Sequence, residues 1–181
     1  MLYIIIAIVV LLVIYVLSQY NSFVKLKNAV KEAFSTMDVY LKKRWDLIPN
    51  LVETVKGYAK HESETLEKIV QARNLSYDKM SETEKIEANQ TITSGLSKLI
   101  AIAENYPELK ANDNFTQLMA ELSKIEEDIA NSRKYYNGVV KEMNTKIEMF
   151  PSNIVAGIFG FRQSKMFETS EEERNNVKVS F

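Results

Sequence analysis

The opening stretch of the chain constrains its fold more than any other feature. Residues 2–17 read LYIIIAIVVLLVIYVL and carry no charged or strongly polar side chain. A helix rises 1.5 Å per residue, and about 20 apolar residues cross the hydrocarbon layer of a bilayer. Tyr15 and Tyr20 stand where aromatic side chains meet the membrane interface. The sequence therefore predicts a transmembrane anchor within residues 1–20.

A cleaved signal peptide is the main alternative to a retained anchor. Val16-Leu17-Ser18 would satisfy the small-residue rule before a cleavage site. However, no Lys or Arg precedes the apolar run, and the run is longer than the apolar region of about 7–15 residues in a typical signal peptide. These features favour a retained anchor, and a buried core helix is the third interpretation.

The charges that follow the apolar run predict its orientation. Six basic residues, but only Glu32 and Asp38 among acidic ones, follow it up to position 44: Lys25, Lys27, Lys31, Lys42, Lys43 and Arg44. By the positive-inside rule, basic flanks stay on the cytoplasmic side. We therefore expect a single-pass membrane protein with most of the chain in the cytoplasm.

Composition narrows the classes of function. The 23 Lys and Arg residues balance 24 Asp and Glu, a net charge of −1, so the chain has no broad basic field for nucleic acid. The absence of cysteine excludes disulfides, thiolate nucleophiles and cysteine-type zinc sites. Five glycines and three prolines in the whole chain favour helices over strands and turns.

Apolar residues after the anchor recur every three or four positions, which is typical of helical core faces. The first stripe runs from Val30 to Ala59 and keeps its phase across Pro49. A proline inside a helix removes one backbone hydrogen bond. The expectation is therefore a kinked long helix to about Arg73, and the alternative is a break at which Asp46 caps a second helix.

Two further helices are marked by their ends. Ser81-Glu82-Thr83-Glu84 fits a capping box, and Tyr106-Pro107 should end the helix that it opens. That helix is expected to bury Ile86, Thr93, Leu96, Ile100 and Ala103.

The last long helix has cap candidates at 112–114 and an apolar seam from Phe115 to Phe150, before Pro151. Alternating steps of three and four predict a helix of about 50 Å with left-handed packing. The seam is expected to form the core of the bundle, and a homo-oligomeric coiled coil is the alternative.

Together these patterns predict an all-α chain: an N-terminal transmembrane helix followed by a bundle of long helices. The expected organisation is an anchor at 1–20, a helical bundle at 21–167 and a polar acidic tail at 168–181.

Motifs for catalysis and cofactors are missing from the sequence. His61 is the one histidine, and Thr65 stands where a zinc-binding helix would need a second one. No phosphate-binding glycine motif and no G-x-S-x-G motif occurs. No catalytic residue, metal ligand or cofactor is therefore assigned, and the chain is expected not to be an enzyme.

Two polar sets are candidates for a structural or binding cluster. The first flanks Pro49 and comprises Arg44, Asp46, Asn50 and Glu53, with Lys56. The second lies on one side of the last long helix, at spacings of seven and four, and comprises Glu126, Arg133 and Asn137. If the two faces meet, Glu126 and Arg133 would form a network with Asp46 or Arg44 that fixes helix register. The alternative is a ligand-sensing or hydrolytic site near the Pro49 kink.

The segment FPSNIVAGIFGF at 150–161 is apolar but too short to span a bilayer. Its large side chains form a candidate contact patch: Ile154, Ile158, Phe159 and Phe161. The patch is expected to fold back over the bundle, and the alternative is contact with the membrane interface or a partner.

Several blocks closely resemble the bacterial LemA family, over nearly the whole chain to about Phe167. They are Asn21, DVYLKKRWDLIPNLVETVKGYAKHE (38–62), Ala72-Arg73, AENYPELKANDNF (103–115), Ala130 with Arg133, Tyr136-Asn137 and FPSNIVAGIFGF. One departure is Trp45, where the family often has tyrosine.

The resemblance implies a single-pass protein anchored in the bacterial cell membrane, whose body is an antiparallel up-and-down bundle of long helices similar to bromodomain-like four-helix folds. It implies no enzymatic activity and no catalytic residue. The expected partners are the lipid bilayer, through the N-terminal helix, and a protein partner or a second copy of the chain.

Overall fold

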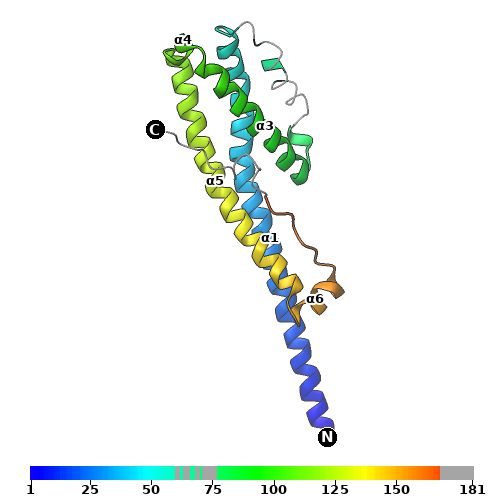
Figure 1. The fold of residues 1–181 in the computed structure, drawn as a ribbon. Helices are drawn as coiled ribbons and strands as arrows, with labels where there is room; N and C mark the ends of the chain where they lie inside the picture. The colour runs from blue at the N-terminus through cyan, green and yellow to red at the C-terminus, as the bar shows by residue number, and fades with distance from the viewer. Residues whose placement is uncertain (60–61, 63–65, 68–69, 71–76, 168–181) are drawn as a thin grey trace, which may run out of the picture. The chain divides into compact units, whose positions relative to one another are not determined.

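The computed structural model describes residues 1–59, 62, 66–67, 70 and 77–167, so His61 and the acidic tail lie outside the described residues. Within the described ranges every regular element is helical (Figure 1): α1 (Leu2–Lys56), the 3₁₀ turn η2 (Tyr77–Lys79), α3 (Glu82–Glu104), α4 (Pro107–Lys110), α5 (Asp113–Glu148) and α6 (Ser152–Phe159). The prediction of an all-α bundle behind an apolar N-terminal helix is confirmed.

The chain forms two compact units, and α1 and α5 contribute residues to both. Unit 1 comprises residues 1–36 and 132–166, and therefore holds α6. Unit 2 comprises the described residues among 37–131 together with Phe167, and therefore holds η2, α3 and α4. Each unit is described by itself below.

Helix α1 is a single helix of 55 residues that contains Pro49. The expected end near Arg73 is wrong, because the helix ends at Lys56 and Gly57 follows. The alternative break near Asp46 is also wrong. Ile48 and Leu51 on either side of Pro49 are fully buried, so packing holds the backbone helical where the proline removes one hydrogen bond.

The first part of α1 is long and apolar enough to cross a membrane. Its large apolar side chains from Leu2 to Ile14 are all at least half exposed. The interpretation of this run as a buried core helix is therefore wrong. Burying so many apolar side chains requires an apolar environment outside the described chain.

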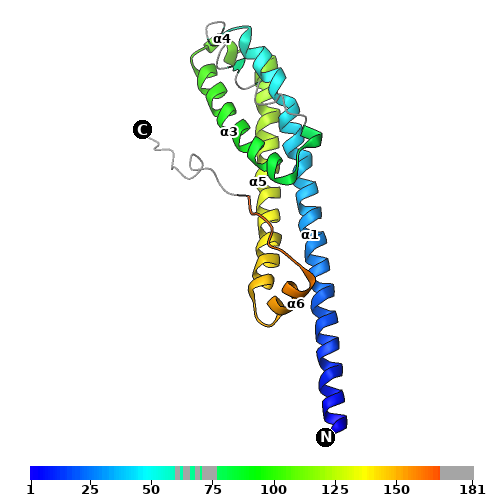
Figure 2. The same ribbon diagram turned by 90° about the vertical axis from the view of Figure 1, so that its right-hand side faces the viewer.

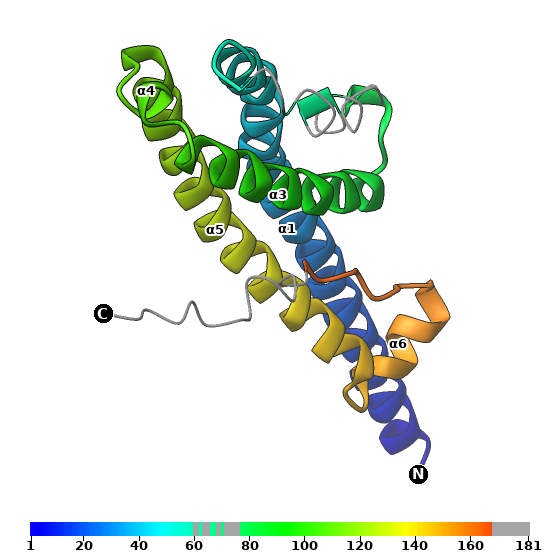
Figure 3. The ribbon, with the colours of Figure 1, turned by 45° about the horizontal axis from the view of Figure 1, so that its top comes forward.

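The core of unit 2 is the meeting of three helices, with α3 lying across α1 and α5 (Figure 3). Its apolar residues come from α1 (Met37, Leu41, Trp45, Leu51, Val55), α3 (Ile86, Ile92, Leu96, Leu99, Ala103) and α5 (Phe115, Leu122, Ile125, Ile129). The expectation that Ile100 is buried is wrong, since the buried stripe of α3 passes through Leu99. Ile100 lies on the exposed flank one position further along the helix.

Local capping explains where α3 and α5 begin. Glu84 N donates to Ser81 Oγ at 3.3 Å, and Ser81 N donates to Glu84 Oε2 at 2.7 Å, so the predicted capping box is present. The backbone N–H and the hydroxyl of Ser81 both donate to the Glu84 carboxylate and lower its pKa. Phe115 N donates to Asn112 Oδ1 at 3.0 Å at the start of α5. The connector between the two helices contains α4, a single turn that begins at Pro107 and was not predicted.

In unit 1, α6 and the segment after it pack on α1 and α5 (Figure 2). The rings of Phe23 and Phe161 stack with centroids 4.9 Å apart. Asn144 holds Ser164 by two hydrogen bonds of 2.9 Å, one to its backbone N–H and one to its carbonyl. Gly160 ends α6 at a φ of 71°, which a residue with a side chain rarely adopts.

The end of α5 agrees with the sequence, but the end of its apolar seam does not. The helix stops at Glu148, before Pro151, as predicted. Phe150, the last expected seam residue, is 78% exposed, because it lies beyond the helix in the turn to α6.

Replacing Ser81 tests the capping box. An N-cap substitution costs about 1 kcal/mol, so we expect Ser81→Ala to lower the melting temperature of the full chain in detergent micelles by about 2–4 °C. Ser81→Thr keeps the hydroxyl and should melt close to the unchanged chain. Thermal unfolding followed by far-ultraviolet circular dichroism measures both, and identical melting of all three chains would contradict a capping role.

Candidate functional site

A buried arginine joins α1, α3 and α5 in unit 2. The side chain of Arg44 on α1 is 0% exposed. Its Nη1 donates to Glu126 Oε1 on α5 at 2.9 Å and to Thr93 Oγ1 on α3 at 3.2 Å. Its Nη2 donates to the side-chain and backbone oxygens of Asn89 at 2.8 and 3.0 Å. One guanidinium therefore holds side chains from both neighbouring helices of unit 2.

The surroundings of Arg44 supply a counter-ion and acceptors for both of its Nη atoms, whereas its buried Nε has no hydrogen-bond partner within the described part of the chain. A buried ion costs much less when a counter-ion and hydrogen-bond acceptors surround it. Glu126 supplies the opposite charge and stays 39% exposed, so its carboxylate keeps some contact with water. Asn89 is itself buried and donates from Nδ2 to the carbonyl of Lys85 at 2.9 Å. This arrangement fixes register and leaves little of the guanidinium open to a ligand.

The predicted cluster around Pro49 separates into different groups. Of the expected network of Glu126 and Arg133 with Asp46 or Arg44, the structure shows the contact between Glu126 and Arg44. Asp46 instead pairs with Lys42 at 3.4 Å, and Glu53 pairs with Lys56 at 3.2 Å, both on the exposed side of α1. Exposed pairs of this kind contribute little to stability.

The remaining members of the predicted polar sets are Asn50, Arg133 and Asn137. Asn50 is exposed on α1. Arg133 and Asn137 are partly buried and belong to unit 1, whereas Glu126 belongs to unit 2. A role for Arg133 and Asn137 in the network stays a prediction.

A second polar group of unit 2 was not predicted from the sequence. Asp38 on α1 accepts hydrogen bonds from Tyr77 Oη at 2.7 Å and from Lys85 Nζ at 2.6 Å. The Lys85 ammonium also lies 4.8 Å from the centre of the Tyr77 ring. Burial, followed by the hydrogen bond to Asp38, raises the pKa of the Tyr77 hydroxyl, so it stays protonated as a donor.

Only some residues of the Arg44 and Asp38 groups could be recognised as buried from the sequence. Asn89 stands in phase with the apolar stripe of α3, three residues before Ile92, so its position predicts burial. Lys85 lies one turn before Asn89 on the same face. Tyr77 had no such signal, because η2 is a single turn with no periodic pattern of its own.

A shallow hollow of about 490 Å³ adjoins the Pro49 region in unit 2. Asp46, Asn50 and Lys43 line it from α1, and Glu121, Lys124 and Asp128 line it from α5. Its charges are mixed in sign. Among the residues that the structure describes, no three His, Asp or Glu side chains come close enough together to hold a metal ion.

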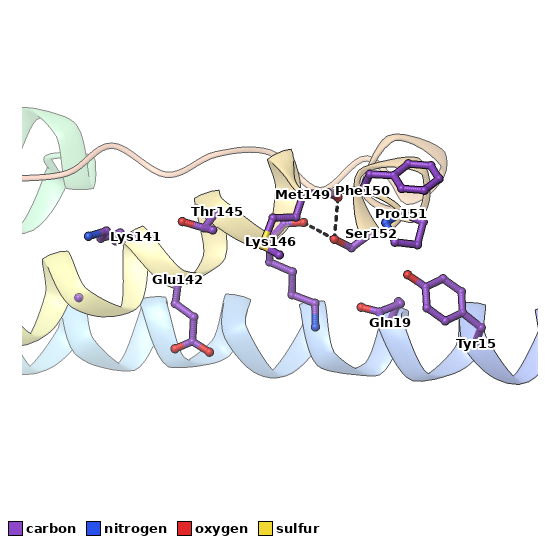
Figure 4. Close-up of a pocket in the computed structure, with 11 residues that line it drawn as sticks. Tyr15, Gln19, Lys141, Glu142, Thr145, Lys146, Met149, Phe150, Pro151 and Ser152 are labelled. Carbon is purple, nitrogen blue, oxygen red and sulfur yellow. Dashed lines mark hydrogen bonds between the residues drawn. The ribbon is translucent and has the colours of Figure 1, made fainter.

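Unit 1 contains a larger hollow of about 680 Å³ at the end of the apolar run (Figure 4). Tyr15 and Gln19 face it from α1, and Lys141 and Lys146 lie on the α5 side. The turn to α6 closes it with Met149, Phe150, Pro151 and Ser152. Most of this lining is apolar, and its charged side chains are Lys141, Lys146 and Glu142, so the hollow suits an amphipathic molecule.

The hydrogen bonds around this hollow hold its wall in place. Ser152 Oγ lies 2.7 Å from the carbonyl of Lys146 and 2.9 Å from that of Met149, to which it can donate, at the otherwise open end of α5. Lys146 Nζ donates to Ser22 Oγ on α1 and lies 5.3 Å from the centre of the Phe23 ring. None of the lining residues was predicted as a site residue, since each looks like an ordinary helix or turn residue in the sequence.

The Arg44 group can be tested by removing its counter-ion. Breaking a buried ion pair costs on the order of 3–5 kcal/mol, and the partial exposure of Glu126 reduces this to about 2 kcal/mol for Glu126→Ala. Glu126→Gln keeps an acceptor and should lose less. The matched control is Glu53→Ala, which breaks an exposed pair and should cost below about 0.5 kcal/mol. Thermal unfolding compares them, and equal losses for Glu126→Ala and Glu53→Ala would contradict a special role for Arg44.

Comparison with known proteins finds a family model and several relatives that match the chain. A family model described as the LemA family matches residues 33–181. The chain is 31% identical over 161 residues to Protein LemA of Metamycoplasma hominis, covering 88% of this chain and 74% of that protein.

More distant relatives are named as magnetosome proteins. The chain is 24% identical over 178 residues to magnetosome protein MamQ 1 of Paramagnetospirillum magneticum, covering 84% of this chain and 65% of that protein. The match to MamQ of Magnetospirillum gryphiswaldense is also 24% identical, over 177 residues, 83% of this chain and 65% of that protein. The chain thus spans slightly less than two thirds of the length of the MamQ proteins.

Proposed function

The chain belongs to the LemA family, and from this premise we propose that it is a single-pass, membrane-anchored helical scaffold without enzymatic activity. The observation that carries the proposal is the exposed apolar run at the start of α1. In hydrocarbon every backbone polar group must be paired within the segment, and a helix achieves this. The same helix then supplies the core face of unit 2 without ending in between.

The charged groups of unit 2 support a scaffold over the hydrolytic alternative. Arg44 is enclosed by Glu126, Asn89 and Thr93, while Asp46 and Glu53 pair with neighbouring lysines. A hydrolytic site would instead direct such side chains together into one cavity. The mixed charges in the hollow near Asp46 and Asn50 are the feature that favours ligand binding as the second candidate.

A scaffold acts by binding. Long helices with solvated faces offer surfaces on which a protein partner or a second copy of the chain can dock. The basic residues after the apolar run favour a cytoplasmic body at the cell membrane. The proposed partners are therefore the bilayer, through α1, and a protein bound by the helical body.

Charged substitutions in the apolar run test the anchor. Each Asp at the centre of a transmembrane helix costs about 2.5–3.5 kcal/mol of insertion free energy. We expect the unchanged chain to stay in membranes washed with alkaline carbonate, and the double variant Val9→Asp/Val10→Asp to be released. Val39→Asp changes an equally exposed valine of the same helix in unit 2 and should behave like the unchanged chain.

Two outcomes would contradict the anchor. One is release of the unchanged chain by carbonate. The other is a mature protein that begins at Gln19 by mass spectrometry, which would show that the apolar run is a cleaved signal peptide.

A further inference from the structure

Unit 1 exposes a second group of apolar side chains, separate in sequence from the apolar run. Helix α6 buries Val155 and Ala156 but exposes Ile154 and Ile158, the latter by 69%. The preceding turn exposes Met149 and Phe150. We name these four exposed side chains, together with the half-exposed Phe159, the α6 patch. Contiguous exposed apolar side chains mark a surface that contacts something apolar.

Ring contacts place the α6 patch beside the end of the apolar run. The ring of Tyr20 lies 4.8 Å from that of Phe159 and 5.8 Å from that of Phe161, measured between centroids. Tyr20 follows the last apolar residue, Leu17, by three positions, which is about 5 Å along a helix. The headgroup zone of a bilayer is about 5–7 Å deep on each side. If the run spans the hydrocarbon, α6 therefore lies at headgroup depth.

The turn before α6 reaches further along the apolar run. Phe150 and Pro151 line the same hollow as Tyr15 and Gln19, and Figure 4 shows Pro151 and Phe150 on the side of the hollow where Tyr15 lies. Tyr15 is itself part of the apolar run. The exposed ring of Phe150 is thus held at the level where the run enters hydrocarbon.

The charge of unit 1 favours lipid over a protein as the occupant of this surface. Its residues include nine Lys and Arg against three Glu, a net charge of +6, although the whole chain carries −1. Lys141 and Lys146 line the hollow beside the turn, together with the acidic Glu142. Basic side chains near an anionic leaflet are attracted to it. Apolar tips flanked by basic residues are the pattern of interfacial membrane contacts.

We propose that the α6 patch is a second membrane contact, which inserts into the headgroup zone of the negatively charged leaflet where α1 enters the bilayer. The inference rests on the proposed function in one respect, that the apolar run of α1 crosses that bilayer. The contact compensates for a run that is slightly short for a bilayer, and it fixes α1 against rotation and tilt.

Tryptophan quenching by brominated lipid tests the contact. The single tryptophan is first removed by Trp45→Phe, and the full chain is placed in vesicles of phosphatidylcholine and phosphatidylglycerol with or without bromine on the upper acyl chain. Phe150→Trp reports on the turn and Val9→Trp on the anchor. Tyr135→Trp, an exposed aromatic position of unit 1 on α5, is the matched control.

We expect bromine to quench Phe150→Trp and Val9→Trp at least about twofold, and to leave Tyr135→Trp unchanged, because bromine quenches only on contact within the membrane. Quenching of Val9→Trp without Phe150→Trp would overturn the second contact while the anchor stands. Quenching of neither would overturn both. Quenching of Tyr135→Trp to the same degree as Phe150→Trp would overturn the inference that the patch is specific.

A second measurement does not depend on an introduced tryptophan. Because the chain has no cysteine, Ile158→Cys can carry a single polarity-sensitive dye. Its emission should shift to the blue in vesicles relative to the same dye on Tyr135→Cys. Equal emission from the two positions would contradict the contact.

Discussion

Both compact units depend on α1 continuing as one helix from Leu2 to Lys56. In hydrocarbon no water can pair a peptide group, so an apolar run can enter a bilayer only as a helix. Beyond the run the same helix provides Phe23 and Phe34 to unit 1, and Met37, Leu41 and Trp45 to unit 2. Pro49 removes one hydrogen bond, and the buried residues beside it hold the helix to Lys56.

The Arg44 group shows what makes three helices of unit 2 adopt one arrangement. Apolar side chains alone allow neighbouring helices to slide with little loss of buried area. A guanidinium that must reach Glu126, Asn89 and Thr93 accepts one register, because any slip leaves a buried charge unpaired. The Asp38, Tyr77 and Lys85 group adds a second such constraint between α1, η2 and α3. These polar contacts explain specificity of packing more directly than they suggest a reaction.

Much of the fold could be predicted because residues that act on their own backbone determine where the helices begin and end. Ser81, Pro107, Asn112 and Pro151 act through their own backbone and caps, and the helix ends lie close to them. The end of α1 was predicted too far along the chain, because the apolar stripe continues past Lys56. Within the site, the contact of Glu126 with Arg44 could be predicted, because residue spacing shows which polar side chains share one face of a helix. Tyr77, Lys85 and the residues around the unit 1 hollow depend on which segments meet in space, and no local pattern records this.

In the proposed topology, the apolar run of α1 crosses a membrane and the helical body lies on the cytoplasmic side. Since the chain lacks cysteine, single cysteines introduced at Tyr3 and at Tyr135 can be labelled without background. The decisive measurement is labelling of bacterial spheroplasts with a membrane-impermeant maleimide. The proposed topology predicts that the cysteine at position 3 reacts in intact spheroplasts and that the cysteine at position 135 reacts only after lysis. Reaction of both positions in intact spheroplasts, or of position 135 alone, would contradict it.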